Sequence, residues 1–452
     1  MSTTKDNRVE TSSNVNKTET ESKSGRFETL AAVAGNVLEW YDFAVFGYFA
    51  DILAEVFFPK QEGSKQLIES FAVFGGAFLM RPLGGIIMGW IGDKYGRKRA
   101  LEISVFLMAF PTFAMGCLPT YDQVGSLAFI LLILVRLFQG LSVGGQLMSS
   151  VVFTLEKKPK AKWGLYGSYV LVATNFGGLM GSLVGAFLRS ALTEQQLYRW
   201  GWRLPFLSGI MVAFCGHYLK EHCQEEMHHE PPKNPLAAAF AKENRRSLLS
   251  ASLVPMLSSA GFYLTYVWLP IFMKDLIDPP VPHAFWIASS ALFLSACLTQ
   301  PMCGWLSDFT GRFKIMVFGI ILCGSIAPLC MYLIGLGDPV VAFLAQASLG
   351  SSLSFYAAPK IAWMMESFPP EVRLTSMSIG YNAAQAVMGG LTPGLATILV
   401  ERVGKIAPGI YLSCVAVISL FGLVCVSPRR NEKEEMVTDD GEGNLAAGKE
   451  LA

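Results

Sequence analysis

Two carboxylic acids stand in a stretch that is otherwise almost wholly apolar or aromatic, GNVLEWYDFAVFGYF, residues 35–49. Glu39 and Asp42 are three positions apart, so a helix places them on one face, where both can reach the same cavity. A carboxylate inside an apolar helix is costly unless it is paired, protonated or exposed to water. The chemistry that fits such acids is the reversible binding of a proton.

A guanidinium in a second apolar run, GSLAFILLILVRLFQG, offers these acids a partner. A nearby Arg favours the charged form of an Asp, whereas separation of the two favours its protonation. We therefore expect one of the two acids, Glu39 or Asp42, to carry the proton and Arg136 to be its counter-ion. A static network of polar groups between helices is the alternative.

A loop motif occurs twice, as GWIGDKYGRKR at 89–99 and GWLSDFTGRFK at 304–314. Such a loop can close by pairing its Asp with its Arg or with a helix N-terminus, and small residues let helices approach. We expect these contacts to form a latch that is made in one state and broken in another; a fixed loop clasp is the alternative. The expected latch residues are Gly89, Asp93, Gly96, Arg97, Asp308, Gly311, Arg312 and Arg373.

Aromatic, amide and cationic side chains within apolar runs are the candidates for substrate contact. An aromatic cage suits a quaternary ammonium, whereas Lys360, just after Pro359 in FYAAPKIAWMMESF, suits a carboxylate. Extension of the Lys360 side chain towards the membrane interface is the alternative. The expected substrate residues are Trp40, Tyr41, Gln146, Tyr266, Lys360, Tyr381 and Asn382.

The elements that must position these residues are membrane helices. Of the 452 residues, 52% are hydrophobic and 16% charged, against roughly 25% charged in a soluble domain. A bilayer core needs about 20 apolar residues per helix, and twelve such runs predict an all-α membrane protein. The runs cover 28–58, 67–91, 100–118, 124–155, 163–189, 203–220, 248–274, 284–306, 314–336, 340–366, 374–400 and 407–427.

The repeat and the charges give the expected organisation. The two loop motifs are 215 residues apart, which predicts two six-helix bundles, 27–220 and 248–427, joined by a cytoplasmic linker, 221–247. Loops on the side of the termini carry about twice as many Lys and Arg as the opposite loops, so we expect both termini in the cytoplasm. The tails 1–26 and 428–452 are polar and expected to be disordered.

These motifs resemble the major facilitator superfamily, whose loop signature is matched twice. Within it the chain resembles the metabolite:proton symporter family, through GNVLEWYDFAVFGYF, FLMRPLGGIIMGWIGDKYGRK, RLFQGLSVGG, WGWRLPFLSG and FPPEVRLTSMSIGYNAAQAVMGGLTP. The last stretch is most similar to the proline/glycine-betaine branch. The resemblance implies two pseudo-symmetric bundles. In the related sugar:proton symporters a Tyr–Asp pair is coupled to an Arg, and Tyr41, Asp42 and Arg136 resemble that set. The resemblance therefore implies that Asp42 is the proton carrier and Arg136 its counter-ion, with Glu39 as a second acid in the cavity. The family usually has Glu where this chain has Gln146, so uniport or exchange stays open.

We therefore expect a proton-coupled symporter of a small zwitterionic or carboxylated metabolite such as proline or betaine. Carriers of dicarboxylate-type acids (2-oxoglutarate, citrate or shikimate-like) and a transport-inactive nutrient sensor are the alternatives. We expect no enzymatic activity, no cofactor and no nucleic acid partner, and a monomer in the plasma membrane. The residues His217, His222, Cys223, His228 and His229 lack the spacing of a metal site.

Overall fold

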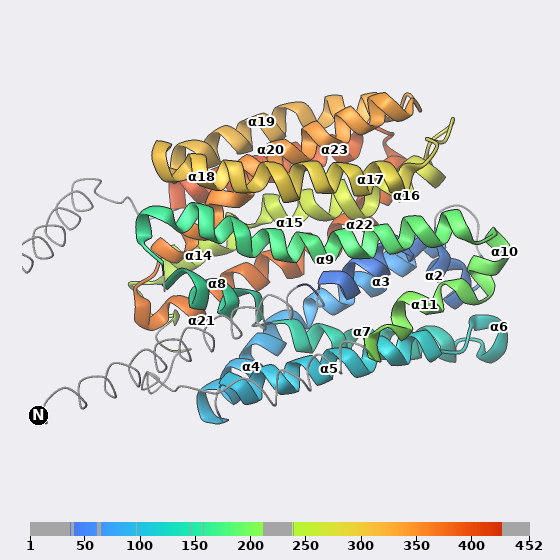
Figure 1. The fold of residues 1–452 in the computed structure, drawn as a ribbon, viewed down its shortest axis with the longest axis horizontal. Coiled ribbons are helices and arrows are strands. Elements are labelled where there is room, and N and C mark those ends of the chain that lie inside the picture. Colours follow the sequence, from blue (N-terminus) through green and yellow to red (C-terminus); the bar gives the residue numbers. More distant parts are fainter. Residues whose placement is uncertain are drawn as a thin grey trace, which may run out of the picture.

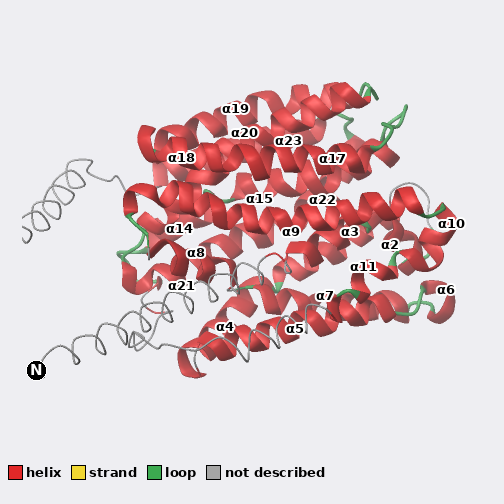
Figure 2. Ribbon diagram, viewed as in Figure 1, coloured by secondary structure: helices red, strands yellow, loops and turns green. Residues whose placement is uncertain are grey.

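The computed structural model describes residues 37, 40–60, 65–95, 97–144, 146–156, 158–210, 237 and 239–426. Within these ranges the regular structure is entirely helical (Figures 1 and 2). The predicted tails 1–26 and 428–452 lie outside the described residues. So do Glu39, Gly96 and the His and Cys residues at 217–229, for which no metal site was expected. The predicted boundary at 220 falls in the undescribed stretch 211–236, and the one at 247 falls in the first turn of a described helix, Arg245–Leu253; the division into bundles stays a prediction.

The first half of the chain begins with helical residues 40–48 and continues through ten α-helices. Their bounds are α2 Ala50–Phe57, α3 Lys65–Leu79, α4 Arg81–Tyr95, α5 Arg97–Cys117, α6 Tyr121–Val124, α7 Leu127–Val143, α8 Gln146–Glu156, α9 Trp163–Ala191, α10 Glu194–Gln196 and α11 Arg203–Leu207, with a 3₁₀ turn, η1 Lys160–Lys162, and a π-helical segment, η2 Leu197–Gly201.

The second half alternates α-helices with wider π-helical segments. Its elements are α14 Arg245–Leu253, α15 Met256–Phe262, η3 Tyr263–Trp268, α16 Leu269–Ile271, η4 Phe272–Leu276, α17 Ala284–Leu292, η5 Phe293–Thr299, α18 Gln300–Thr310, α19 Arg312–Ile334, α20 Pro339–Glu366, α21 Pro370–Ala384, η6 Gln385–Gly389, α22 Gly390–Arg402, α23 Ala407–Phe421 and η7 Gly422–Val426.

Nine helical stretches within the described residues are long and apolar enough to cross a bilayer. They coincide to within a few residues with nine of the twelve predicted runs, from Lys65–Met88 to Ala407–Val426. The predicted run 100–118 overlaps α5, whose apolar part Phe106–Cys117 is shorter. The runs 28–58 and 203–220 extend beyond the described residues, so the total of twelve stays a prediction.

The two halves of the chain pack along two lines of helices. The long helix α9 of the first half lies against α17, α18 and α20, and α3 lies against α22. Small residues permit this approach: a side chain at Gly304 would meet the carbonyl oxygen of Gly164 at 2.5 Å. The repeated loop motif forms the same element twice, since α4 and α5 meet around position 96, and α18 and α19 meet at Gly311. Gly311 has φ 92°, a conformation that favours glycine.

The helices run lengthwise, so the connections gather at two opposite ends (Figure 1). The end with α8, α14 and α21 contains Asp308 and is called the Asp308 end. The end with α6, α10 and α16 contains Asp51 and is called the Asp51 end. Contacts between the halves at these ends, and the buried groups between them, make up the candidate site.

Candidate functional site

The carboxylate of Asp42 is buried among polar side chains from two other helices, α5 and α7. Its side chain is 2% exposed, and its Oδ1 atom accepts a hydrogen bond from the hydroxyl of Thr112 in α5 at 2.8 Å. Its Oδ2 atom accepts one from the Nε2 of Gln139 in α7, also at 2.8 Å. Both oxygens of this acid therefore have close donors.

Arg136 lies further from the Asp42 carboxylate than Thr112 and Gln139 do. Its Nη1 lies 3.5 Å from the Asp42 Oδ2 and donates to the Oε1 of Gln139 at 2.8 Å. The guanidinium is fully buried and lies over the ring of Phe46, 4.1 Å from its centroid. An aromatic face stabilises a desolvated cation, so the Arg rests on rings while Gln139 bridges it to the acid.

The structure thus brings together the two groups that the sequence nominated, Asp42 and Arg136, and adds Thr112 and Gln139. The roles of Asp42 and Arg136 stay predictions. Glu39 lies outside the described residues. Gln146 begins α8, but its side chain is not among those described.

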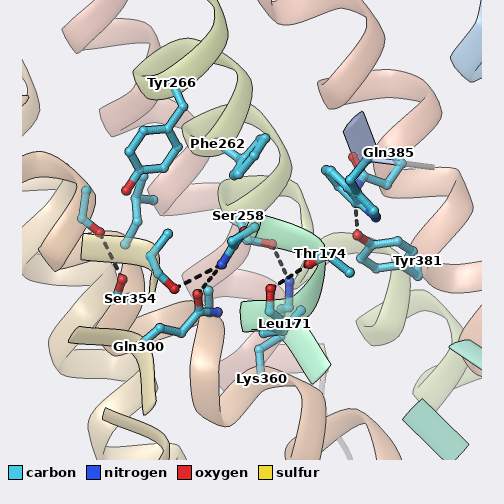
Figure 3. Close-up of a pocket in the computed structure, with 16 residues that line it drawn as sticks. Leu171, Thr174, Ser258, Phe262, Tyr266, Gln300, Ser354, Lys360, Tyr381 and Gln385 are labelled. Carbon is cyan, nitrogen blue, oxygen red and sulfur yellow. Dashed lines mark hydrogen bonds between the residues drawn. The ribbon is translucent and has the colours of Figure 1, made fainter. Parts of the chain in front are cut away.

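A small cavity of about 70 Å³ is lined by side chains from both halves of the chain (Figure 3). Four of the predicted substrate residues line it: Trp40, Tyr266, Lys360 and Tyr381. Amide and hydroxyl groups complete its polar lining, including Asn175, Gln300, Ser258, Ser354, Thr174 and Gln385. Among the described residues, the lining contains one cation and no carboxylate.

That cation, Lys360, is 3% exposed and points into the cavity rather than to the membrane interface. Its Nζ donates to the hydroxyl of Ser258 at 2.5 Å and lies 5.6 Å from the ring centroid of Tyr381 (Figure 3). The structure therefore does not have the Lys360 side chain extended towards the membrane interface, which was the alternative. A buried ammonium with one neutral acceptor leaves room for an anionic partner.

Two further polar atoms in cavity-lining residues have no hydrogen-bond partner among the described residues. They are the indole Nε1 of Trp40, a donor, and the Oε1 of Gln385, an acceptor. The Nε2 of Gln385 donates to the hydroxyl of Tyr381 at 2.6 Å, so the Oε1 is the amide atom left without a partner among the described residues. Buried polar atoms are normally paired, so both are ready for a ligand.

Two other predicted substrate residues lie away from this cavity. The hydroxyl of Tyr41 is 3.4 Å from the carbonyl oxygen of Pro205 and 3.3 Å from the hydroxyl of Ser208. Asn382 donates to the carbonyl oxygen of Gly144 and so joins the two halves. The geometry therefore gives neither residue a place in the cavity.

Arg81, at the start of α4, is a buried cation for which the sequence argument proposed no role. It is 1% exposed, and its guanidinium lies 4.3 Å from the ring centroid of Phe78 and 5.9 Å from that of Trp40. Its Nε and Nη2 have no hydrogen-bond partner among the described residues. An Arg within the run FLMRPLGG was the signal available in the sequence.

At the Asp308 end, the second copy of the loop motif joins the two halves. Asp308 accepts hydrogen bonds from the backbone N–H groups of Gly164 and Leu165, at 2.8 and 2.9 Å, in the first turn of α9. It also lies 3.4 Å from Arg312. A carboxylate at a helix N-terminus satisfies unpaired N–H groups and interacts favourably with the helix dipole.

Two arginines add further contacts at this end. Arg312 pairs with Glu366 and donates to the carbonyl oxygen of Lys160 at 2.9 Å. Arg373 lies 3.0 Å from Glu156 of the first half. Asp308, Arg312 and Arg373 therefore occupy inter-half positions, whereas Gly311 is exposed at the turn between α18 and α19. Gly96 and the side chains of the first copy, at positions 89, 93 and 97, lie outside the described part, so their latch role stays a prediction.

At the Asp51 end, one carboxylate is shared by both halves. Asp51 is contacted by Arg189 of α9 at 2.6 Å and by Lys274 of the second half at 3.0 Å. Lys274 is also 3.2 Å from Asp275. A cavity of about 320 Å³ opens beside this cluster. Nearby, burial and the carboxylates of Asp51 and Glu55 raise the pKa of Tyr198, which therefore stays a neutral phenol.

Membrane-length helices in two halves that meet around a polar cavity, with contacts at both ends, define a secondary transporter. Residues 35–393 match the family model described as Major Facilitator Superfamily, and residues 251–448 match it a second time. The chain belongs to the major facilitator superfamily. It is accordingly a multi-pass membrane transporter of small solutes and not an enzyme.

Characterised relatives are similar over most of the chain. The identity is 31% over 406 residues with the glycine betaine/proline/ectoine/pipecolic acid transporter OusA of Dickeya dadantii, covering 86% of this chain and 81% of that protein. It is 33% over 367 residues with the alpha-ketoglutarate permease of Escherichia coli, covering 80% and 84%. These relatives confirm the resemblance to the metabolite:proton symporter family.

Solved structures support the fold. The xylose transporter XylE from E. coli, in a partially occluded inward open conformation, matches with a TM-score of 0.68 at 17% identity, covering 89% of this chain and 99% of that one. A crystal structure of the D-xylose-proton symporter gives the same TM-score at 18% identity, covering 88% and 97%. The predicted fold class is therefore confirmed.

Proposed function

We propose that this protein is a proton-coupled symporter of a small zwitterion that carries a carboxylate, such as proline or betaine. The observation that carries the proposal is the buried Lys360 in a cavity whose described lining has no carboxylate. Relatives named as proline and betaine transporters support the same solute class. The carboxylate of the solute is the counter-ion of Lys360.

The cavity also suits the positive end of a zwitterion. Aromatic rings of Trp40, Phe262 and Tyr266 stand in its lining, with centroids of Trp40 and Phe262 5.4 Å apart. Ring faces attract a quaternary ammonium such as that of betaine. The free Oε1 of Gln385 accepts a hydrogen bond from an N–H group, such as that of proline.

The proton site in this proposal is Asp42, with Arg136 as counter-ion. Asp42 is two residues from Trp40, which lines the cavity, so one short helix carries a proton group and a substrate contact. A shift of this helix on solute binding would change the distance between Asp42 and its partners, and hence its affinity for a proton. Coupling by linkage requires such a shared element.

Alternating access, in which the site faces one side and then the other, requires contacts that open in turn. The Asp308 contacts and the Asp51–Lys274 pair lie at opposite ends and join the halves in each case. We assign the first set to a cytoplasmic gate and the second to an outer gate. The predicted cytoplasmic position of both termini belongs to this proposal.

A dicarboxylate carrier is the second candidate, and Arg81 is the observation that favours it. Its guanidinium lies 5.9 Å from the ring centroid of Trp40, and its Nε and Nη2, which have no partner among the described residues, could bind a second carboxylate. The relative named as an alpha-ketoglutarate permease supports this class. We rank it second because Arg81 is not among the residues that line the cavity.

Purified protein in liposomes tests the proposal. With an inward proton gradient, proline or betaine should accumulate and the lumen should acidify in proportion. Accumulation of 2-oxoglutarate instead of proline or betaine would show that the substrate is a dicarboxylate and not a zwitterion. Uptake that ignores the gradient would contradict symport, and no uptake of any of these solutes would favour the nutrient sensor.

A further inference from the structure

The hydroxyl of Thr112 has two acceptors within reach and one proton to give. Its Oγ1 lies 2.8 Å from the Oδ1 of Asp42 and 2.8 Å from the carbonyl oxygen of Met108 in its own helix. It also accepts a hydrogen bond from the Nε2 of Gln139 at 2.9 Å. A hydroxyl has one donor and two acceptor positions, so only one of the two oxygens can receive its proton at a time.

The other partners of Asp42 cannot change their direction of donation. Arg136 has donors only. Its Nη1 donates to the Oε1 of Gln139 at 2.8 Å, which holds the amide with its NH₂ group towards Asp42. Of the side chains in hydrogen-bond contact with Asp42 in the described structure, Thr112 is therefore the one that can both donate and accept.

We propose that Thr112 is a positioning residue for the proton site, whose hydroxyl reverses direction when Asp42 gains or loses its proton. This inference rests on the proposed role of Asp42 as proton carrier. With Asp42 charged, the Thr112 hydroxyl donates to Oδ1. With Asp42 protonated at Oδ1, the carboxylic acid donates to Thr112, and the Thr112 hydroxyl turns to the carbonyl oxygen of Met108.

The side chains of Asp42 and Thr112 have hydrogen-bond partners both when Asp42 is charged and when it is protonated. In the charged state Oδ1 accepts from Thr112 and Oδ2 accepts from Gln139. In the protonated state Oδ2 keeps its donor, the new O–H has an acceptor, and the Thr112 hydroxyl has its own acceptor. No buried donor loses its partner, so the acid can change charge without moving and without the cost of an unpaired polar group.

Other ionisable groups surround this site and are not altered by changes at Thr112. Arg136 of α7 faces the acid directly, and Arg81 of α4 and Tyr263 of η3 face Arg136. Tyr41 adjoins Asp42 in the chain. A shift in the pH profile of a Thr112 variant is therefore attributable to the lost hydroxyl.

The test compares Thr112→Val, which keeps the shape and removes the hydroxyl, with Thr112→Ser, which keeps the hydroxyl. Solute binding is followed by thermal shift across pH, and proton-driven uptake is followed in liposomes. A hydrogen bond to a charged group is stronger than one to a neutral group, so the Val variant loses more from the charged acid. Its binding profile should move to higher pH by about one unit, while the Ser variant follows the wild type.

The proposal fails if the Val profile coincides with the wild-type profile, or if the Ser variant shifts as far as the Val variant. Should Thr112→Val not give folded protein, Thr112→Ala must produce the same shift. The proposed proton carrier is tested separately by Asp42→Asn. Proton-driven uptake that survives in Asp42→Asn contradicts the proposed function, whereas a Thr112→Val profile without a shift contradicts only the present inference.

Discussion

The two buried charges assigned to transport, Asp42 and Lys360, depend on opposite chemistry. Asp42 is surrounded by donors, so its negative charge is satisfied within the protein. Among the described residues Lys360 has a single acceptor, the neutral hydroxyl of Ser258, so its positive charge is only partly satisfied there. The first group suits a proton and the second suits a bound anion.

Replacement of Asp42 by Asn should separate uptake from the proton gradient. The amide keeps the size of the side chain but binds no proton, so gradient-driven accumulation should fall to the level measured without a gradient. Solute exchange across the same liposomes should continue. Asp122→Asn, at an exposed position in α6, is the matched control and should accumulate solute normally. Accumulation by Asp42→Asn at the wild-type level would exclude Asp42 as the carrier.

Replacement of Lys360 by Met should weaken solute binding. Loss of one hydrogen bond to a charged group costs about 1.5–3 kcal/mol, or about 10- to 100-fold in affinity. Binding titration by calorimetry measures the change, with Lys405→Met, an exposed Lys near the Asp51 end, as control. Equal affinities for the Met variant and the wild type would remove the carboxylate subsite from this cavity.

At the residue scale, charge made part of the site predictable. A charged side chain within an apolar run is rare and costly, which selected Asp42, Arg136 and Lys360 from the sequence. Thr112 and Gln139 gave no such signal, because neutral polar residues are common in membrane helices. Their role follows from the way α5 and α7 pack against the helix of Asp42, which spacing along one chain does not specify.

At the scale of elements, the first turn of α9 is held by a carboxylate from the other half of the molecule. Asp308 thereby acts as the N-terminal cap of α9 and as an inter-half contact at once. Separation of the halves would leave two N–H groups of α9 without this acceptor. The state of the Asp308 end and the stability of the α9 terminus are therefore linked.

Asp308→Ala should favour the state that is open at this end. Loss of a cap costs about 1 kcal/mol, which corresponds to roughly a fivefold change in the population of the open state. A cysteine placed at Ala357, which lines the cavity, in a chain without its own cysteines reports this change. An impermeant thiol reagent applied from the Asp308 side should modify it about five times faster.

Asp338→Asn provides the matched control for that experiment. Asp338 caps α20 by accepting from Val340 and Val341, so it serves a helix of its own half only. Its removal should lower thermal stability without changing the modification rate at position 357. Equal acceleration by both variants would show that lost stability, rather than a gate, explains the effect.

Most helix bounds in the second half were predictable, because hydropathy and helix-breaking residues define them locally. The run 340–366, for example, corresponds to α20, which begins at Pro339 and ends at Glu366. The π-helical segments, such as η3, were not predicted. They change the hydrogen-bond spacing without changing composition, so hydropathy alone does not reveal them.

At the scale of the whole molecule, the Asp308 and Asp51 ends should act in opposition. A change that loosens one end favours opening there, at the expense of opening at the other. The Asp51–Lys274 pair joins the halves at 3.0 Å and is the counterpart of the Asp308 contacts.

Lys274→Met should accordingly favour opening at the Asp51 end. A partly exposed pair contributes up to about 1 kcal/mol, which limits the change to roughly fivefold. The cysteine at position 357 should react faster from the Asp51 side and more slowly from the Asp308 side. Lys60→Met, at an exposed position near the same end, should alter neither rate. Acceleration from both sides would indicate general loosening and contradict the opposition.

If the Asp51 end is a gate, as proposed, its arrangement of charges also bears on the speed of transport. Arg189 contacts Asp51 within the first half, and Asp275 contacts Lys274 within the second. When the halves part, only the pair between Asp51 and Lys274 is replaced by contacts with water. Asp51 keeps Arg189 as its partner and Lys274 keeps Asp275, so neither charge is left unpaired. Because no desolvated, unpaired charge forms in this exchange, we expect opening at the Asp51 end to cost less free energy than the rupture of an isolated buried pair.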